Sequence, residues 1–351
     1  MEETLARVLR QDQAITAVCE AAAEVDCLLS LAFSSRMHDW VKPEVTEDNV
    51  LEIQGGHHPL QTLQVPTFVP NDTHIAGGRG IGTEPENGEG GARSVVIVTG
   101  ANACGKSVYL KQNALIPFMA QIGCFVPAQS ARLGVVDKIF TRVQTQEGVS
   151  KLQSSFMIDL AQVSLALRNS TARSLIVMDE FGKGSLSTDG AGLFAGVISH
   201  LLKRGAECPK VLASTHFHEL FTRGLIPPSF PISYAYMNVL LTENHSAEGG
   251  GLSQTEVTYL YKVTPGLCLE SYAAECARSY GLRPDIVERA RFVSDILKRD
   301  EIGLLLDEDM TEEEAKELEV CAEVCQRFVR WKMSVQDEVK VKNRLNAVLE
   351  R

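Results

Sequence analysis

The sequence predicts an α/β protein with a mainly parallel sheet and flanking helices. Three short, almost wholly apolar stretches at 95–99, 174–178 and 211–214 have the length and composition of buried strands. One helical pattern begins near Lys106, after the first stretch, and another covers 190–202, between the second and third stretches. Strands that alternate with helices are typical of a parallel sheet covered on both faces. With 351 residues, 44% of them hydrophobic, the chain is long enough to bury a large core.

The N-terminal part is expected to be helical. Apolar residues from Leu5 to Ala32 recur at helical spacing without an internal Gly or Pro, and Pro43 ends the pattern. A short strand is expected at 50–53. The segment 77–91 contains seven glycines with interspersed charges, which indicates a flexible surface insertion.

The net charge of −11 is concentrated near the C-terminus. Between Asp300 and Glu323 there are eleven acidic residues and one lysine, so the rest of the chain sums to only −1. The stretch 324–351 has seven basic and three acidic residues on an amphipathic helical pattern. We interpret 301–351 as an acidic segment and a C-terminal helix that together form a dimerisation element.

Cysteine usage and hydropathy bear on location. Nine cysteines without a disulfide-like spacing are typical of a chain kept reduced inside a cell, and the N-terminal residues do not resemble a signal peptide. The twenty uncharged residues 112–131 include two prolines and four side-chain amides. We therefore expect a buried helix and a loop there, and no membrane partner.

A glycine-rich turn follows the first apolar strand. Gly100-Ala101-Asn102-Ala103-Cys104-Gly105-Lys106-Ser107 fits GxxxxGK[ST] and opens a helix, which is the context that this motif requires. Backbone amides of such a turn cradle nucleotide phosphates, Lys106 neutralises their charge, and the Ser107 hydroxyl ligates Mg²⁺. The motif predicts a P-loop nucleoside triphosphatase.

The other two strands also end in polar side chains. Asp179 is placed to hold Mg²⁺ and Glu180 to activate water, while His216 is placed to contact a γ-phosphate or the attacking water. Because the carboxyl ends of parallel strands share one sheet edge, these groups are expected to converge. A carboxylate next to the metal ligand favours a hydrolase over a kinase, and the sequence has no NKxD guanine-reading motif.

These motifs and several further strings resemble the C-terminal ATPase domain of MutS proteins, over roughly residues 20–300. The resemblance implies a P-loop fold of the ABC-ATPase type and ATP sites shared between two subunits of a DNA-binding dimer. It also implies that 1–45 ends a lever and clamp region and that 46–300 is the ATPase domain. The additional strings are Phe125-Val126-Pro127-Ala128, Ile139-Phe140-Thr141-Arg142, Ser154-Ser155-Phe156-Met157 and Ser214-Thr215-His216-Phe217.

Two segments look like the fifth eukaryotic, meiotic branch of the family: Glu180-Phe181-Gly182-Lys183-Gly184 and the stretch 156–163. That branch implies an ATP-gated clamp on branched DNA in meiotic recombination, in the nucleus and on chromosomes. It also implies a heterodimer with the fourth, meiotic homologue, with DNA contacts mainly from domains absent from this chain. The alternatives are a mismatch-repair MutS ATPase and a nucleotide-gated clamp subunit with little hydrolysis.

The resemblance also assigns site residues one by one. Phe68 and Tyr261 match the aromatic rings on the two faces of adenine, for which a plain core role is the alternative. Ser154 matches a serine offered across the dimer to the partner's γ-phosphate. Asp179 and Ser107 are assigned to Mg²⁺, and Glu180 and His216 to catalysis. The P-loop contacts to ATP are assigned to Gly100, Asn102, Gly105, Lys106 and Ser107.

Overall fold

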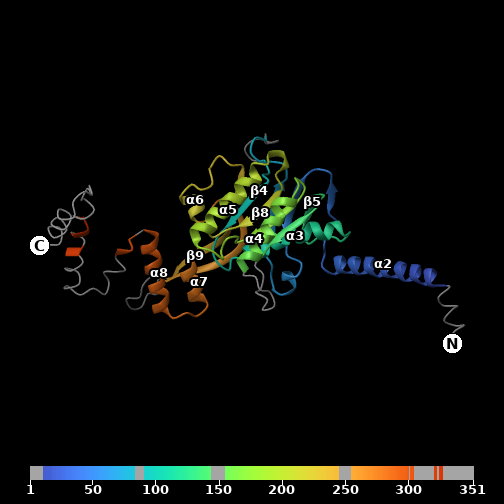
Figure 1. Cartoon of the computed structure of the whole chain (residues 1–351). Coiled ribbons are helices and arrows are strands. Elements are labelled where there is room, and N and C mark those ends of the chain that lie inside the picture. The colour runs from blue at the N-terminus through green and yellow to red at the C-terminus, as the bar shows by residue number, and fades with distance from the viewer. Residues whose placement is uncertain are drawn as a thin grey trace, which may run out of the picture. The chain divides into compact units, whose positions relative to one another are not determined.

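The computed structural model describes residues 11–83, 91–143, 155–244, 254–299, 301–303, 320–321 and 324–326 (Figure 1). The chain divides into two compact units, Met1–Cys276 and Ala277–Arg351. The sequence analysis placed the end of the ATPase domain at residue 300, and that bound remains a prediction. Most of the acidic segment and of the C-terminal helix expected from the sequence lies outside the described residues.

A six-stranded sheet forms the centre of the first unit, in the order β10-β9-β4-β8-β7-β6. All neighbouring pairs are parallel except the pair of β9 and β10, which is antiparallel. This arrangement confirms the predicted mainly parallel sheet. The strands are β4 (Val95–Thr99), β6 (Ile139–Arg142), β7 (Leu175–Asp179), β8 (Lys210–Ser214), β9 (Ile232–Asn244) and β10 (Gln254–Pro265).

Alternate residues of the strands point to two separate cores. Val96 and Val98 of β4 pack with Leu110 of α3 (Lys106–Gln121) on one face. Val95 and Ile97 pack on the other face, with α4 (Ser155–Asn169) and α5 (Ser187–Leu202). The two-residue period of a strand thus explains why these continuous apolar runs are buried on both sides. The short α6 (Glu219–Thr222) follows β8.

A second, four-stranded sheet packs on the α3 side, in the order β1-β5-β2-β3. Leu51, Ile53 and Ile75 from this sheet are buried in the same core as α3. The sequence analysis predicted only part of β2 in this sheet. Its strands are β1 (Glu44–Thr46), β2 (Val50–Gly56), β3 (Asn71–Ala76) and β5 (Ser130–Gly134), with the 3-10 helix η1 (Gln61–Leu63) between β2 and β3.

The first part of the glycine-rich segment is held in place, contrary to the flexible insertion expected over 77–91. The backbone N–H of Gly78 donates to the Cys208 carbonyl at 2.7 Å, and that of Gly80 donates to the Gly205 carbonyl, in the 3-10 helix η3 (Gly205–Glu207), at 3.0 Å. A Cβ on Gly80 would lie 2.3 Å from the Leu202 oxygen. Glycine is therefore needed here for close backbone approach, and residues 84–90 lie outside the described part of the chain.

Helices also lie on either side of the sheet-forming region in the sequence. The N-terminal helix is α2 (Asp12–Met37), within the range expected, and most of its side chains are exposed. Residues 1–10 of the expected helix are outside the described part. α7 (Ala273–Ser279) spans the division between the two units, and α8 (Pro284–Lys298) lies in the second. Pro284 stands in the first turn of α8, where no backbone N–H is needed. No helix among the described residues is long and apolar enough to cross a membrane.

Candidate nucleotide-binding site

The turn between β4 and α3 has the backbone of a phosphate-binding loop. Gly100 has a φ of +126° and Gly105 a φ of +94°, which are conformations that L side chains rarely adopt. The turn places the N-terminus of α3, with its unpaired N–H groups, at the carboxyl end of β4. Asn102 is exposed on this turn and Ser107 is half-buried in the first turn of α3. The predicted loop therefore exists with its anion-binding end accessible.

Lys106 lies folded over the same turn. Its Nζ donates to the Gly100 carbonyl at 2.9 Å and to the Ala101 carbonyl at 2.6 Å, and only 5% of the residue is exposed. Burial lowers the pKa of Lys106, while Cys104, Glu180 and Asp179 act in the opposite direction. A positive charge in so dry a site interacts strongly with an incoming phosphate.

Asp179 ends β7 beside Ser214, the last residue of β8. The Ser214 hydroxyl donates to Asp179 Oδ1 at 2.6 Å, and only 4% of Asp179 is exposed. Ser214 Oγ also accepts the backbone N–H of Glu180 at 3.2 Å. Ser214 thus orients both acidic residues, a role that the sequence analysis did not assign. Its place at the end of the strand paired with β7 was the available signal.

Glu180 is held between two basic side chains. Its Oε1 lies 2.6 Å from His216 Nε2, and its Oε2 accepts a hydrogen bond from Lys183 Nζ at 2.7 Å. The close approach of His216, followed by Lys183, lowers the pKa of Glu180 to about 2. The carboxylate therefore stays ionised at neutral pH and is suited to orienting water through its charge. The sequence analysis named Lys183 only within the string that resembles the meiotic branch, without a role at Glu180.

An apolar cavity of about 280 Å³ lies next to the loop and contains both predicted aromatic residues. Phe68 and Tyr261 line it together with Val108 of α3. Asn71 joins the two distant segments, because its Nδ2 donates to the Tyr261 carbonyl at 2.9 Å and its Oδ1 accepts from the Val263 N–H at 2.7 Å. The size and lining suit a purine base. Sequence reasoning did not assign Asn71, although it lies only three residues after Phe68.

The comparisons agree with this geometry. MutS domain V matches residues 96–298, which is more than half of the chain. The chain belongs to the MutS family. It is similar to MutS protein homolog 5 of Saccharomyces cerevisiae, with 38% identity covering 96% of this chain and 38% of the relative. The same-named protein of Caenorhabditis elegans is 35% identical over 86% of this chain and 20% of the relative.

Bacterial relatives match the same region of this MutS-family chain. The DNA mismatch repair protein MutS of Carboxydothermus hydrogenoformans is 36% identical, covering 82% of this chain and 31% of the relative. The chain thus spans about a fifth to two fifths of the length of the curated relatives described here. The P-loop fold expected from the family resemblance is confirmed, whereas the role of each site residue remains a prediction.

The oxygen donors of this MutS domain fit a magnesium ion. The Asp179 carboxylate and the Ser107 hydroxyl are hard ligands of the kind that Mg²⁺ prefers. In the described part of the chain, no three His, Cys, Asp or Glu side chains are grouped so that they could hold a metal ion. A magnesium ion would therefore depend on nucleotide phosphates for further ligands, as is usual in phosphoryl-transfer sites. Ser154, the residue expected to act across a dimer, lies outside the described residues.

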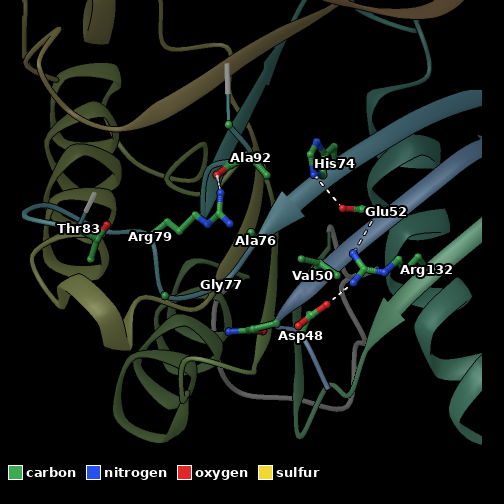
Figure 2. Close-up of a pocket in the computed structure, with 13 residues that line it drawn as sticks. Asp48, Val50, Glu52, His74, Ala76, Gly77, Arg79, Thr83, Ala92 and Arg132 are labelled. Carbon is green, nitrogen blue, oxygen red and sulfur yellow. Dashed lines mark hydrogen bonds and ion pairs between the residues drawn. The ribbon is translucent and has the colours of Figure 1, made fainter. Parts of the chain in front are cut away.

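A second cavity in this MutS chain, of about 630 Å³, is lined by charged groups that pair with one another (Figure 2). Arg132 of β5 forms ion pairs with Asp48 and with Glu52 of β2. His74 of β3 lies 3.2 Å from Glu52, and Arg79 donates to a backbone carbonyl. The charges of this wall are balanced, so the smaller apolar cavity beside the P-loop is the better candidate for a nucleotide.

Proposed function

We propose that this MutS-family chain is the ATP-binding and ATP-hydrolysing part of a DNA-binding dimer. The observation that carries the proposal is the joint placement of Lys106, Asp179 and Glu180 at one sheet edge, with an apolar cavity of base size beside the same loop. Phosphate, metal and base subsites are all required to bind and cleave a nucleoside triphosphate, and here they are contiguous through α3.

Each residue has a distinct task in the proposed reaction. Adenine enters between Phe68 and Tyr261, and the triphosphate lies along the turn from Gly100 to Ser107. Lys106 turns its ammonium from the loop carbonyls to the phosphates. Ser107 and Asp179 would hold Mg²⁺, which would neutralise negative charge on the phosphates when bound.

The water-activating group in the proposed reaction is Glu180. With its pKa lowered to about 2, the carboxylate acts chiefly by orienting the attacking water. His216, whose Nε2 lies 2.6 Å from Glu180, is placed to share the water or to contact the γ-phosphate. Ser214 fixes both acids by its hydrogen bonds and has no contact with substrate in this scheme.

We also infer a meiotic assignment for the dimer. The similarity to MutS protein homolog 5 of yeast extends over 96% of this chain and supports that branch over the repair branch. The proposal is that the chain acts on branched DNA in the nucleus, on chromosomes, with the fourth homologue as its partner. Ser154 would complete the partner's ATP site, and segments beyond this chain would supply most DNA contacts.

The central test replaces Glu180 by Gln. The variant should bind ATP as wild type does and hydrolyse it at least about 100-fold more slowly, because the charge that orients water is removed. Binding is measured by titration with a fluorescent ATP analogue and turnover by phosphate release, for the chain alone and with its partner. Glu207→Gln, at an exposed site in η3, is the matched control and should keep wild-type turnover.

Two results would oppose this assignment. Normal turnover in Glu180→Gln, with the partner present, would remove Glu180 from the mechanism. A wild-type dimer that binds ATP but releases no phosphate would instead favour the clamp subunit with little hydrolysis.

A further inference from the structure

Gln112 is a buried polar residue in the wall of the apolar cavity. It lies on α3, four residues after Val108, so both residues face the cavity side of the helix. The residue is 0% exposed. Its Nε2 donates to the Gly56 carbonyl at 3.2 Å, whereas its Oε1 has no hydrogen-bond partner among the described residues. A buried acceptor without a partner is uncommon in native proteins.

The position of the Gln112 carboxamide is fixed by β2 and β3. A Cβ built on Gly56 would lie 3.2 Å from both Gln112 Nε2 and the backbone oxygen of Asn71. The carboxamide therefore lies where β2 ends and β3 begins, next to the segment that carries Phe68 into the cavity. Its hydrogen bond to Gly56 engages the nitrogen and leaves the oxygen for another donor.

Two other polar residues of the cavity wall, Asn71 and Tyr109, have partners within the protein. Asn71 uses its amide nitrogen and oxygen to join Tyr261 and Val263. The Tyr109 hydroxyl lies 2.9 Å from Thr73 Oγ1 and donates to the Asp72 carbonyl at 3.2 Å. These groups shape the cavity, whereas the Gln112 oxygen is an acceptor that a ligand can satisfy.

We propose that Gln112 Oε1 accepts a hydrogen bond from the exocyclic amino group of adenine and so selects ATP over purine nucleotides without that donor. The inference rests on the proposed ATP site and names its base-selecting residue. Stacking between Phe68 and Tyr261 favours any purine, because every base presents a π face. Guanine carries a carbonyl at the corresponding position, and two acceptors facing each other repel.

The test compares two nucleotides in three full-length chains. Dissociation constants are measured for ATP and for purine riboside triphosphate, which lacks only the 6-amino group. Wild type should bind ATP about tenfold more tightly, the usual value of one hydrogen bond. Gln112→Met, of similar length but without the acceptor, should bind the two nucleotides equally. Asn113→Leu is the matched control. Asn113 is also buried on α3, and its Oδ1 has no hydrogen-bond partner in the described part of the chain, but it does not line the cavity.

Each outcome decides the inference. If Gln112→Met retains the preference for ATP, the inference is overturned. It is also overturned if Asn113→Leu loses the preference together with Gln112→Met, because the effect would then not be specific to Gln112. If wild type binds neither nucleotide, the proposed function fails too. If Gln112→Met binds ATP tightly and keeps the wild-type preference for ATP over purine riboside triphosphate, only the role of Gln112 is refuted. If Gln112→Met does not fold, wild type is titrated with N6,N6-dimethyl-ATP, which has no N6 hydrogen. Binding equal to that of ATP would overturn the inference, and about tenfold weaker binding would support it.

Discussion

Glu180 combines an unfavourable backbone conformation with a strongly stabilised charge. Its φ of +55° lies in the left-handed region, which non-glycine residues rarely occupy. The backbone is held there because the Glu180 N–H donates to both the carbonyl and the hydroxyl of Ser214. Strain that the surroundings maintain in this way is concentrated at functional sites. In this conformation the carboxylate lies 2.6 Å from His216 Nε2 and 2.7 Å from Lys183 Nζ.

The Glu180 charge predicts a pH-dependent contribution to stability. Its pKa is about 2 in the folded protein and 4.5 ordinarily, so the contribution is fully present above pH 4.5 and is lost as pH falls toward 2. Glu180→Gln should therefore lower the free energy of unfolding by at most about 3 kcal/mol at neutral pH, and by progressively less below pH 4.5.

Urea unfolding of wild type and Glu180→Gln, from pH 7 down to pH 3, measures this difference. Glu207→Gln controls for the general effect of acid. A stability difference that is the same at every pH would show that the folded protein does not stabilise the Glu180 charge.

At the scale of elements, Arg142 joins three of them. It stands at the end of β6, forms a buried ion pair with Asp159 of α4, and donates to the backbone carbonyl of Asp179 in β7. The side chains of Arg142 and Asp159 are 8% and 5% exposed. Because α4 begins at Ser155, this contact connects the helix that follows Ser154 in sequence with β7, which ends in the proposed metal ligand Asp179.

Replacing Arg142 by Met should destabilise the fold by about 3–5 kcal/mol, because Asp159 would be left as a buried charge without its partner. The measurement is the free energy of unfolding in urea. The double variant Arg142→Met/Asp159→Leu removes both charges and should recover most of the loss. If the double variant is no more stable than Arg142→Met alone, packing rather than the unpaired charge accounts for the effect.

The elements differ in how far the sequence predicts them. β4, β7 and β8 are continuous apolar runs because both faces are covered, and their patterns were recognised. β3 and β5 carry polar residues on an exposed face, so their patterns are weak, and the four-stranded sheet was not predicted. The glycines at 77–81 indicated flexibility by composition, yet neighbouring backbone fixes them.

At the scale of the whole molecule, this chain corresponds to only part of the length of each relative described. It covers 38% or less of the relatives described, and its own residues form one compact unit to Cys276 and a second beyond it. A site that borrows Ser154 from a partner would be incomplete in a single chain. Activity is therefore expected to depend on assembly.

A reconstituted dimer should separate the two proposed contributions of this chain. Lys106→Ala should abolish ATP binding at the chain's own site, because the buried ammonium is lost, whereas Ser154→Ala should slow hydrolysis about tenfold or more at the partner's site. Phosphate release is measured twice, once with the partner's ATP site inactivated and once with the ATP site of this chain inactivated. If Ser154→Ala leaves the partner's turnover unchanged, the contact across the dimer is excluded.

The P-loop, the acidic pair Asp179 and Glu180 at the end of β7 and the histidine after β8 could be predicted from sequence, because each belongs to a local motif at the end of an apolar strand. The way these parts are completed depends on tertiary contacts that no local motif encodes. Phe68 and Tyr261 share a cavity because Asn71 ties their segments together. Gly56 binds the amide nitrogen of Gln112, whose oxygen has no partner among the residues that the structure describes. These features arise from contacts between distant segments, and local patterns carry no record of such contacts.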